Sequence, residues 1–283
     1  LTDDVGLRTG YDYLKNNFEF STIVEDDIAQ ATALGGITKG VYNIELTAAF
    51  ASLANSGTYT EPVLYTEILD HDGNVLIDNT APATHEAVKD STAYLLTSAM
   101  EDVVNSGTGY GAGLSNMATA GKTGSTDDYV DRWFVGFTPY YTAGIWGGYD
   151  ANKSMSGYGS WHLSIWNAIM ERIHQNLEYK DFEIPTSVVQ KSICTETGLL
   201  AVSGCPARTD YFDKDTLPTE SCPGHVQEQA PDTNSDTDTS DNTGNTNTGD
   251  TNTDNGNTGG GDTGGGDTGG GNTGGDTGGG ETG

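Results

Sequence analysis

Residues 117–149 read MATAGKTGSTDDYVDRWFVGFTPYYTAGIWGGY, and they decide the fold class because they carry three β-like runs in quick succession. The runs are Met117–Ser125, Arg132–Thr138 and Tyr141–Tyr149. Only Pro139 and Tyr140 separate the second run from the third, so these two strands are predicted to be antiparallel neighbours. A small antiparallel sheet is therefore expected at this point of the chain.

Helical patterns lie on both sides of the predicted sheet. The expected helices are Ile23–Leu34, Ile44–Ala54 and Ser91–Val104 before it, and Trp161–Leu177 after it. Asn43 is expected to cap the second helix, Gly35 to end the first and Gly57 to end the second. The apolar stripes predicted for the last two helices are Leu95, Leu96, Met100 and Val103, and Trp166, Ile169, Ile173 and Leu177.

A β-hairpin is predicted between the second and third helices. Pro62–Asp70 and Asn74–Asp78 flank His71-Asp72-Gly73, a sequence typical of a turn. Helices before and after a small antiparallel sheet indicate an α+β domain, layered as α/β/α.

The segment Ala120–Thr126, AGKTGST, is the strongest candidate for a functional site. A nucleotide P-loop needs Gly, four residues, then Gly-Lys-Ser/Thr and a helix. Asn116 stands where the first glycine should be, and a further β-like run follows in place of a helix. These departures disfavour nucleotide binding.

The other interpretation is a Lys-Thr-Gly motif on a sheet edge, which is one signature of serine β-lactamases and penicillin-binding proteins. Lys122 would supply positive charge beside the nucleophile and the substrate carboxylate, and the Ser125 N–H could face a developing oxyanion. These two are the predicted catalytic residues. Thr123, Gly124 and Thr126 are the predicted substrate-binding residues, with Gly124 letting a ligand lie close against the strand.

The surroundings of this motif resemble the transpeptidase domain of class A penicillin-binding proteins. The matching stretches, in order, are Ala33–Gly36, Thr38–Val41, Leu46–Asn55, Gly57–Tyr59, Ser106–Gly109, Ala120–Thr126, Trp133–Pro139 and Trp146–Asp150. The resemblance covers roughly Leu1–Arg172. A weaker one continues to His225 and is similar to the C-terminal extension of Gram-positive members.

The resemblance implies an incomplete β-lactamase/transpeptidase-like serine acyl-enzyme fold and a DD-transpeptidase activity without a cofactor. An active-site serine would attack the D-Ala-D-Ala bond of a peptidoglycan stem peptide, form an acyl-enzyme and pass the acyl group to an amine. β-Lactams would mimic the donor. Class A members also carry a glycosyltransferase domain and a membrane anchor, so the expected place is the extracellular face of the cytoplasmic membrane of a Gram-positive bacterium, among the cell-wall synthesis machinery.

Two motifs of the family are missing from this chain. No serine is followed by Lys at the Ser-x-x-Lys spacing. Ser187 and Lys191 come nearest, but they are one residue too far apart. Ser240-Asp241-Asn242 spells the family's second motif, but it follows Lys-Thr-Gly instead of preceding it. The nucleophile and Ser-x-Asn are therefore expected upstream of Leu1, which is interpreted as a cut in a longer protein. The chain alone is predicted to be inactive.

Two other functions stay open from the sequence. One is a β-lactamase or DD-carboxypeptidase of the same fold, which its deacylation rate would distinguish. The other is a non-catalytic binding module on the cell surface, with the glycine-rich tail as its spacer.

Charge and composition limit the partners. The chain carries a formal net charge of -29, and the segment 228–283 holds 11 of its 41 acidic residues and none of its 12 basic ones. Such a chain repels nucleic acid and anionic lipid, and it contains no apolar run long enough to span a membrane. The predicted divisions are 1–180 (part of the transpeptidase domain), 181–227 (a cysteine-containing extension) and 228–283 (a disordered acidic tail).

No metal site is predicted. Cys194, Cys205 and Cys222 form no Cys-x-x-Cys pair and are expected either to include one disulfide or to be three buried thiols. The five histidines show no metal-ligand spacing. Asp127-Asp128-x-x-Asp131 is interpreted as a solvated loop, and Asp236-x-Asp238 lacks the glycine of a calcium loop.

Overall fold

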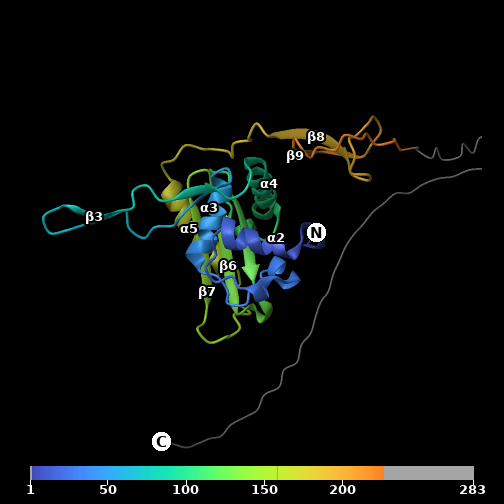
Figure 1. The fold of residues 1–283 in the computed structure, drawn as a ribbon. Helices are drawn as coiled ribbons and strands as arrows, with labels where there is room; N and C mark the ends of the chain where they lie inside the picture. Colours follow the sequence, from blue (N-terminus) through green and yellow to red (C-terminus); the bar gives the residue numbers. More distant parts are fainter. Residues whose placement is uncertain (1, 158, 226–283) are drawn as a thin grey trace, which may run out of the picture. The chain divides into compact units, whose positions relative to one another are not determined.

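The computed structural model describes residues 2–157 and 159–225 (Figure 1). The predicted tail from Glu228, together with Asp236-x-Asp238 and Ser240-Asp241-Asn242, lies outside the described residues. Within them, no helix has the length and apolar character needed to cross a bilayer.

The predicted three-stranded sheet is confirmed. It consists of β5 (Ala120–Ser125), β6 (Asp131–Phe137) and β7 (Thr142–Gly148), in the order β5-β6-β7 with both pairs antiparallel. Gly124 lies opposite Trp133, and Trp133 lies opposite Trp146. The central strand thus sets the register of both neighbours.

Two apolar clusters cover the two faces of this sheet. On one face Phe134 of β6 packs edge-on against Trp166 of α5 (Trp161–His174), with ring centroids 5.1 Å apart. On the other face Phe137 packs with residues of α3 (Asn43–Ala54) and α4 (Asp90–Ser106). This arrangement confirms the layered α/β/α architecture.

The apolar stripes predicted for α4 and α5 are wrong in part, because Leu96, Ile169 and Ile173 are 46%, 50% and 46% exposed. The buried residues are Ser91, Ala93, Tyr94, Thr97, Met100 and Val104 in α4, and His162, Leu163, Trp166, Met170 and His174 in α5. Among the polar members, the Thr97 hydroxyl donates to the carbonyl of Ala93 at 2.8 Å, whereas Nδ1 of His162 has no hydrogen-bond partner among the described residues. The buried face of α4 therefore includes small and polar side chains where large aliphatic ones were expected, while that of α5 keeps Leu163, Trp166 and Met170.

The helix predicted over Ile23–Leu34 is also wrong. Two 3-10 turns, η2 (Glu25–Asp27) and η3 (Gln30–Leu34), stand there. The carboxylate of buried Asp27 accepts the backbone N–H of Val24 at 2.9 Å and both the N–H and the hydroxyl of Thr38 at 2.8 and 2.7 Å. These bonds lower the pKa of Asp27. They hold the segment as a loop, which Gly35 closes at φ 87° as expected.

Helix α3 has the predicted extent, but Asn43 is not its cap. Tyr42 occupies the N-cap position, and Asn43 is the first helical residue. The side-chain amide of Asn43 instead donates to the carbonyl of Gly144 in β7 at 3.1 Å. The residue thus ties the helix to the sheet.

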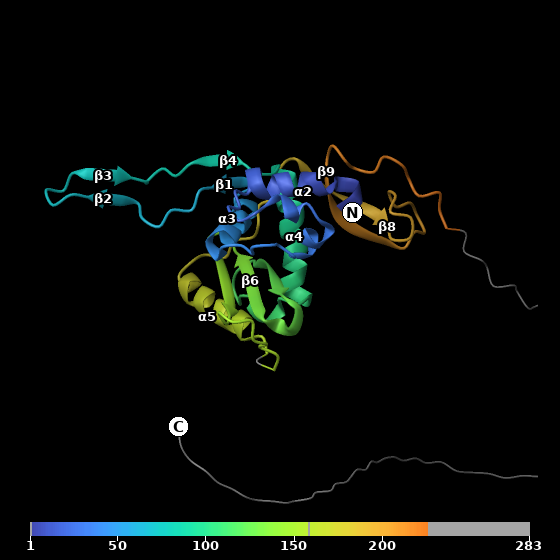
Figure 2. The same ribbon diagram turned by 60° about the horizontal axis from the view of Figure 1, so that its bottom comes forward.

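The predicted hairpin is confirmed as β2 (Glu67–Leu69) and β3 (Val75–Asp78), paired antiparallel. Figure 2 shows it extending away from the helices and the central sheet, beyond the pair β1 (Thr58–Thr60) and β4 (Thr84–Glu86). The remaining short helices are α1 (Thr2–Val5), α2 (Leu7–Asp12), η1 (Tyr13–Asn17), η4 (Tyr110–Ala112) and η5 (Asp127–Tyr129).

A separate two-stranded sheet follows α5. It pairs β8 (Val188–Cys194) antiparallel with β9 (Ala207–Asp213). Polar bonds join it to the start of α4: the Ser187 hydroxyl donates to Asp90 at 2.8 Å, and the Ser91 hydroxyl donates to Asp213 at 2.5 Å. The bond from Ser91 lowers the pKa of Asp213.

Gly57 allows the chain to turn from α3 into β1. Its φ is +88°, and a Cβ there would lie 2.0 Å from the carbonyl oxygen of Val88. We expect Gly57→Ala to lower the free energy of unfolding by about 2–4 kcal/mol, because backbone strain and a backbone clash add. Gly73→Ala is the control, since Gly73 has φ +85° with open space around it, and it should cost about 1–2 kcal/mol. If urea titrations gave equal losses of unfolding free energy for the two variants, the structure would have relieved the clash with Val88.

Glu101 of α4 gives the fold a pH dependence. Burial, and then the carboxylates of Asp181 and Asp102, raise the pKa of Glu101 from 4.5 to about 7. The folded protein therefore binds this proton more tightly than the unfolded chain, and stability falls as pH rises from 4.5 through about 7.

We therefore expect Glu101→Gln to stabilise the fold on the order of 1–2 kcal/mol at about pH 8, with little difference at about pH 4.5. Urea unfolding at both pH values measures this. Glu67→Gln, on the exposed strand β2, is the control and should show no such change. A constant effect of Glu101→Gln across this range would contradict a raised pKa.

Candidate functional site

Lys122 lies on an accessible edge of the central sheet. Among the described residues, β5 pairs with β6 on one side only, so its other edge is open. The Lys122 side chain is exposed, and its ammonium donates to the carbonyl of Thr123 at 3.1 Å. In residues 2–157 and 159–225 no carboxylate forms an ion pair with it. The lysine therefore presents an uncompensated positive charge on an acidic chain.

The alternation of β5 sorts the site residues between two faces. Lys122 and Gly124 share a face with their cross-strand partners Val135 and Trp133. Thr123 and Ser125 belong to the opposite face. Any ligand that contacts both sets must therefore lie along the strand edge, where both faces can be reached.

Thr108 contacts the site from the loop after α4. Its hydroxyl is 2.7 Å from the hydroxyl of Thr123. A hydroxyl has one donor and two acceptor positions, so Thr123 keeps hydrogen-bonding capacity for a ligand. Thr108 lies in the stretch Ser106–Gly109, which belongs to the family resemblance but predicts no role for this residue. Its pairing with Thr123 depends on the fold and has no local sequence signal.

The two glycines of the motif differ in what surrounds them. A Cβ on Gly121 would lie 2.6 Å from the ring of Phe134, so this glycine is required by core packing. A Cβ on Gly124 would lie 3.1 Å from the Cβ of Trp133, a tight but adjustable contact. Close approach of a ligand to Gly124 stays a prediction, and packing against Trp133 is an additional reason for the missing side chain.

Thr126 belongs to a fixed turn. Its hydroxyl donates to the carboxylate of Asp131 at 3.1 Å and accepts the Asp131 N–H at 3.0 Å. The indole N–H of Trp146 donates to the other carboxylate oxygen at 2.8 Å. A substrate-binding role for Thr126 stays a prediction, and it would have to share this hydroxyl. Asp131 is fully engaged, so Asp127-Asp128-x-x-Asp131 does not act as a free set of carboxylates.

An open hollow of about 460 Å³ begins at the C-terminal end of β5. Its lining residues are Ser125, Thr126, Asp127, Asp128, Tyr129, Ser154 and Ser156. Asp128 and Tyr129 have φ of 55° and 56°, in the left-handed region that non-glycine residues rarely adopt. The Ser154 hydroxyl donates to the Asp128 carbonyl at 2.6 Å and helps to hold this conformation.

The sequence contains no Ser-x-x-Lys motif, which would place a serine nucleophile and a lysine base beside this edge strand. Ser187, the nearest approach to that spacing, begins the β8–β9 segment and donates its hydroxyl to Asp90. The strand edge thus offers a positive charge and hydroxyl groups, and a serine nucleophile outside this chain stays a prediction.

Comparison with protein families identifies this arrangement. The family model described as "Penicillin binding protein transpeptidase domain" matches residues 4–171. The model described as "Penicillin-binding protein 1A, C-terminal domain" matches residues 184–227.

Named relatives agree. "Penicillin-binding protein 1A" of Clostridium botulinum (strain Langeland) is 32% identical over 241 residues, which are 81% of this chain and 29% of the relative. "Penicillin-binding protein 4" of Bacillus subtilis is 35% identical over 173 residues, covering 60% of this chain and 27% of the relative. The chain therefore spans less than a third of the length of these relatives.

Solved structures confirm the fold. Penicillin-binding protein 1A from Haemophilus influenzae superposes with a TM-score of 0.64 at 22% identity, covering 78% of this chain and 38% of that one. PonA1 from Mycobacterium tuberculosis gives a TM-score of 0.54 at 22% identity, covering 65% and 54%. The β-lactamase/transpeptidase-like fold expected from the sequence is thus confirmed.

The turn after β5 depends on Asp131. We expect Asp131→Ala to raise the amide hydrogen-exchange rate of residues 126–130 by about tenfold, because a hydrogen bond worth about 1–2 kcal/mol to a charged group is lost. Asp150→Ala, an exposed carboxylate beyond the end of β7, is the control and should leave these amides unchanged. Unaltered exchange in Asp131→Ala would mean that the turn is held by its backbone alone.

Proposed function

The chain belongs to the penicillin-binding protein transpeptidase family, and from this premise we propose that it is part of a DD-transpeptidase that cross-links peptidoglycan. The observation that carries the proposal is the exposed, unpaired Lys122 on the open edge of β5, inside the segment that matches the family. The relatives reported above are named penicillin-binding proteins, which disfavours a β-lactamase, a carboxypeptidase or a non-catalytic module.

The open edge of β5 suits an extended peptide. A stem peptide ending in D-Ala-D-Ala would add to it as a further strand, with main-chain hydrogen bonds giving affinity. Its terminal carboxylate would be held by the ammonium of Lys122 and the hydroxyls of Thr123 and Ser125. Thr126 would contact it from the turn, and Gly124 would leave room for its backbone.

The chemistry requires a serine from outside this chain. That serine would attack the carbonyl carbon of the D-Ala-D-Ala bond, release D-Ala and form an acyl-enzyme ester. An amine of a second stem peptide would then attack this ester and displace the serine. The Ser125 N–H would donate to the oxyanion in both tetrahedral intermediates. Lys122, beside the reacting groups, would stabilise the same negative charge, and no metal or cofactor has a step in this sequence.

β-Lactams would bind at the same place as analogues of the donor peptide. A structure of PonA1 from Mycobacterium tuberculosis was solved in complex with penicillin V, which supports this expectation for the family. We further propose that the longer protein acts at the extracellular face of the cytoplasmic membrane of a Gram-positive bacterium. A membrane anchor, a glycosyltransferase domain and contacts with the cell-wall synthesis machinery belong to the same proposal.

The proposed division of the chain follows from this function. Residues 1–180 would complete the transpeptidase domain, 181–227 would form an extension, and 228–283 would be an acidic tail. The match of a separate family model to 184–227 supports treating the extension as a unit.

Intact-mass analysis with penicillin tests the proposal on the longer natural protein and on this 283-residue chain. We expect a one-to-one covalent adduct on the longer protein only, at a serine that precedes Leu1. Lys122→Gln should slow acylation by about 10²–10³-fold, in the range of a lost transition-state contact. Gly124→Val should abolish it by filling the strand edge.

Lys153→Gln is the control, because Lys153 is an exposed lysine outside β5 that stacks over Tyr149, after the end of β7. It should acylate at the unaltered rate. Full-rate acylation of both Lys122→Gln and Gly124→Val would refute the placement of the site. An adduct on the 283-residue chain would mean that the nucleophile lies within it.

A further inference from the structure

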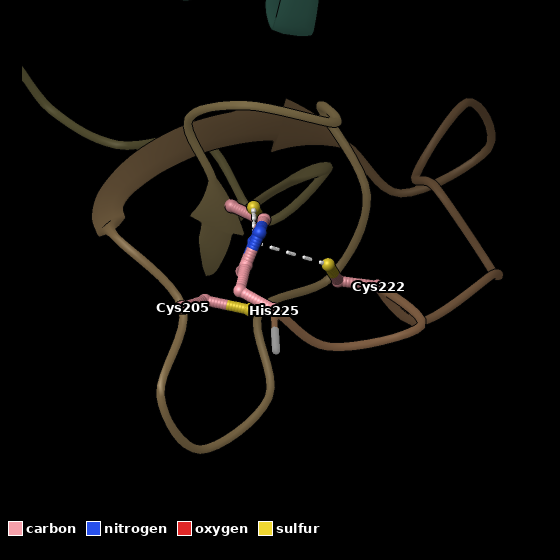
Figure 3. Close-up of side chains that lie close together, drawn as sticks. Cys205, Cys222 and His225 are labelled. Atoms are coloured by element: carbon pink, nitrogen blue, oxygen red, sulfur yellow. Dashed lines mark hydrogen bonds between the residues drawn. The ribbon is translucent and has the colours of Figure 1, made fainter. Parts of the chain in front are cut away.

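Four side chains converge at the far end of the β8–β9 segment: Cys194, Cys205, Cys222 and His225. Their three sulfurs and one imidazole nitrogen all lie within 4.8 Å of one another. Figure 3 shows the sulfur of Cys222 facing the imidazole of His225, with Cys205 beside them. All three cysteines are free thiols, and Cys194 and Cys222 are buried. The arrangement gathers four metal-binding atoms around one point.

The distances approach those of a tetrahedral site. Nε2 of His225 is 3.0 Å from the Cys194 sulfur and 3.5 Å from the Cys222 sulfur. Zinc–sulfur bonds of about 2.3 Å and zinc–nitrogen bonds of about 2.0–2.1 Å place neighbouring ligand atoms roughly 3.5–3.8 Å apart in a tetrahedron. Binding a metal ion would therefore require the ligand atoms to move by only several tenths of an ångström to about one ångström.

A carboxylate orients the histidine. Nδ1 of His225 lies 2.9 Å from a carboxylate oxygen of Glu196. A proton on Nδ1, donated to Glu196, leaves the lone pair of Nε2 facing the sulfurs. A carboxylate on the outer nitrogen is the usual second contact of a metal-bound histidine.

A backbone N–H also points at one of the sulfurs. The Val202 N–H donates to the Cys205 sulfur at 3.4 Å. Such donors stabilise negative charge on a thiolate ligand. Cys205 thus lies in a turn that favours the thiolate, which is the metal-binding form of its side chain.

The loops of the segment are joined by backbone hydrogen bonds but not by an apolar cluster. None of the apolar core clusters among the described residues includes a residue of 186–225. Units of about 40 residues or fewer usually need a metal or disulfides to fold. The four residues come from the end of β8, the turn before β9 and the chain beyond β9, so one ion would join all three places.

We propose that Cys194, Cys205, Cys222 and His225 bind one structural Zn²⁺ ion. Three sulfurs and one imidazole are a donor set typical of zinc, and four protein ligands leave no open position for catalysis. Binding would release the protons of three thiols and leave a net charge of -1 on the site. A disulfide would use only two of the four groups and leave the histidine without a role.

The proposal departs from the expectation that the chain has no metal site. The sequence signal was Cys222-x-x-His225, a close ligand pair that a search for Cys-x-x-Cys and for histidine pairs passes over. The other two ligands, Cys205 and Cys194, stand 17 and 28 residues upstream of Cys222, too far away to form a local motif with it.

Metal analysis of the 283-residue chain, purified without reductant or chelator, tests the proposal. We expect one zinc per chain and three thiols that react with Ellman's reagent only after unfolding or chelation. Glu196→Gln should weaken zinc binding by about 10–100-fold while keeping all four ligands. Glu220→Gln, an exposed carboxylate of the same segment, is the matched control and should bind zinc normally.

Cobalt substitution gives a second measurement, which reports directly on the ligands. After removal of zinc, Co²⁺ should bind in a one-to-one ratio and give thiolate charge-transfer and tetrahedral d–d absorption bands. His225→Gln should alter these bands, whereas His71→Gln, at an exposed histidine of the β2–β3 turn, should not. One reactive thiol with a disulfide, or three reactive thiols without a stoichiometric metal, would overturn the proposal.

Discussion

The packing of Phe134 against Trp166 is the contact on which the rest of the structure depends. It seats the middle strand of the sheet on α5, and a second contact, from the Trp166 indole N–H to the Ala143 carbonyl at 2.9 Å, fixes β7 beside it. The ring of Phe134 also fills the space where Gly121 and Gly136 lack side chains. With β6 fixed in this way, β5 has one register, and Lys122 has one position on the open edge.

Much of this architecture could be predicted from local sequence. The short connection at Pro139-Tyr140 and the turn at Gly73 each specify a hairpin, and Lys122–Gly124 was placed correctly on a strand. The loop around Asp27 could not be predicted, because its hydrogen bonds come from Thr38, eleven residues away. The exposure of Leu96 and Ile169 was missed for a similar reason, since helix periodicity does not reveal which neighbours a helix meets.

The candidate site also has a part that can be predicted from the sequence and a part that depends on the fold. The residue types of the edge strand follow from the chemistry of holding a carboxylate, and they are visible in the sequence. The contacts of Thr108 with Thr123 and of Asp131 with Trp146 join positions 15 residues apart, and only the sheet brings them together. The cysteine cluster is the extreme case, because its members are gathered by turns at Gly198, Gly204 and Gly224.

The β2–β3 hairpin projects from the molecule, and its apolar side chains remain largely solvent-accessible: Leu69, Val75 and Leu76 are 51%, 53% and 64% exposed. The strands at its base, β1 and β4, pair with each other, and β1 packs beside α3. A protease that cut the tip would therefore sever the chain without separating the halves. The nicked protein would migrate as two fragments in denaturing gels while keeping the mass of a single molecule in solution.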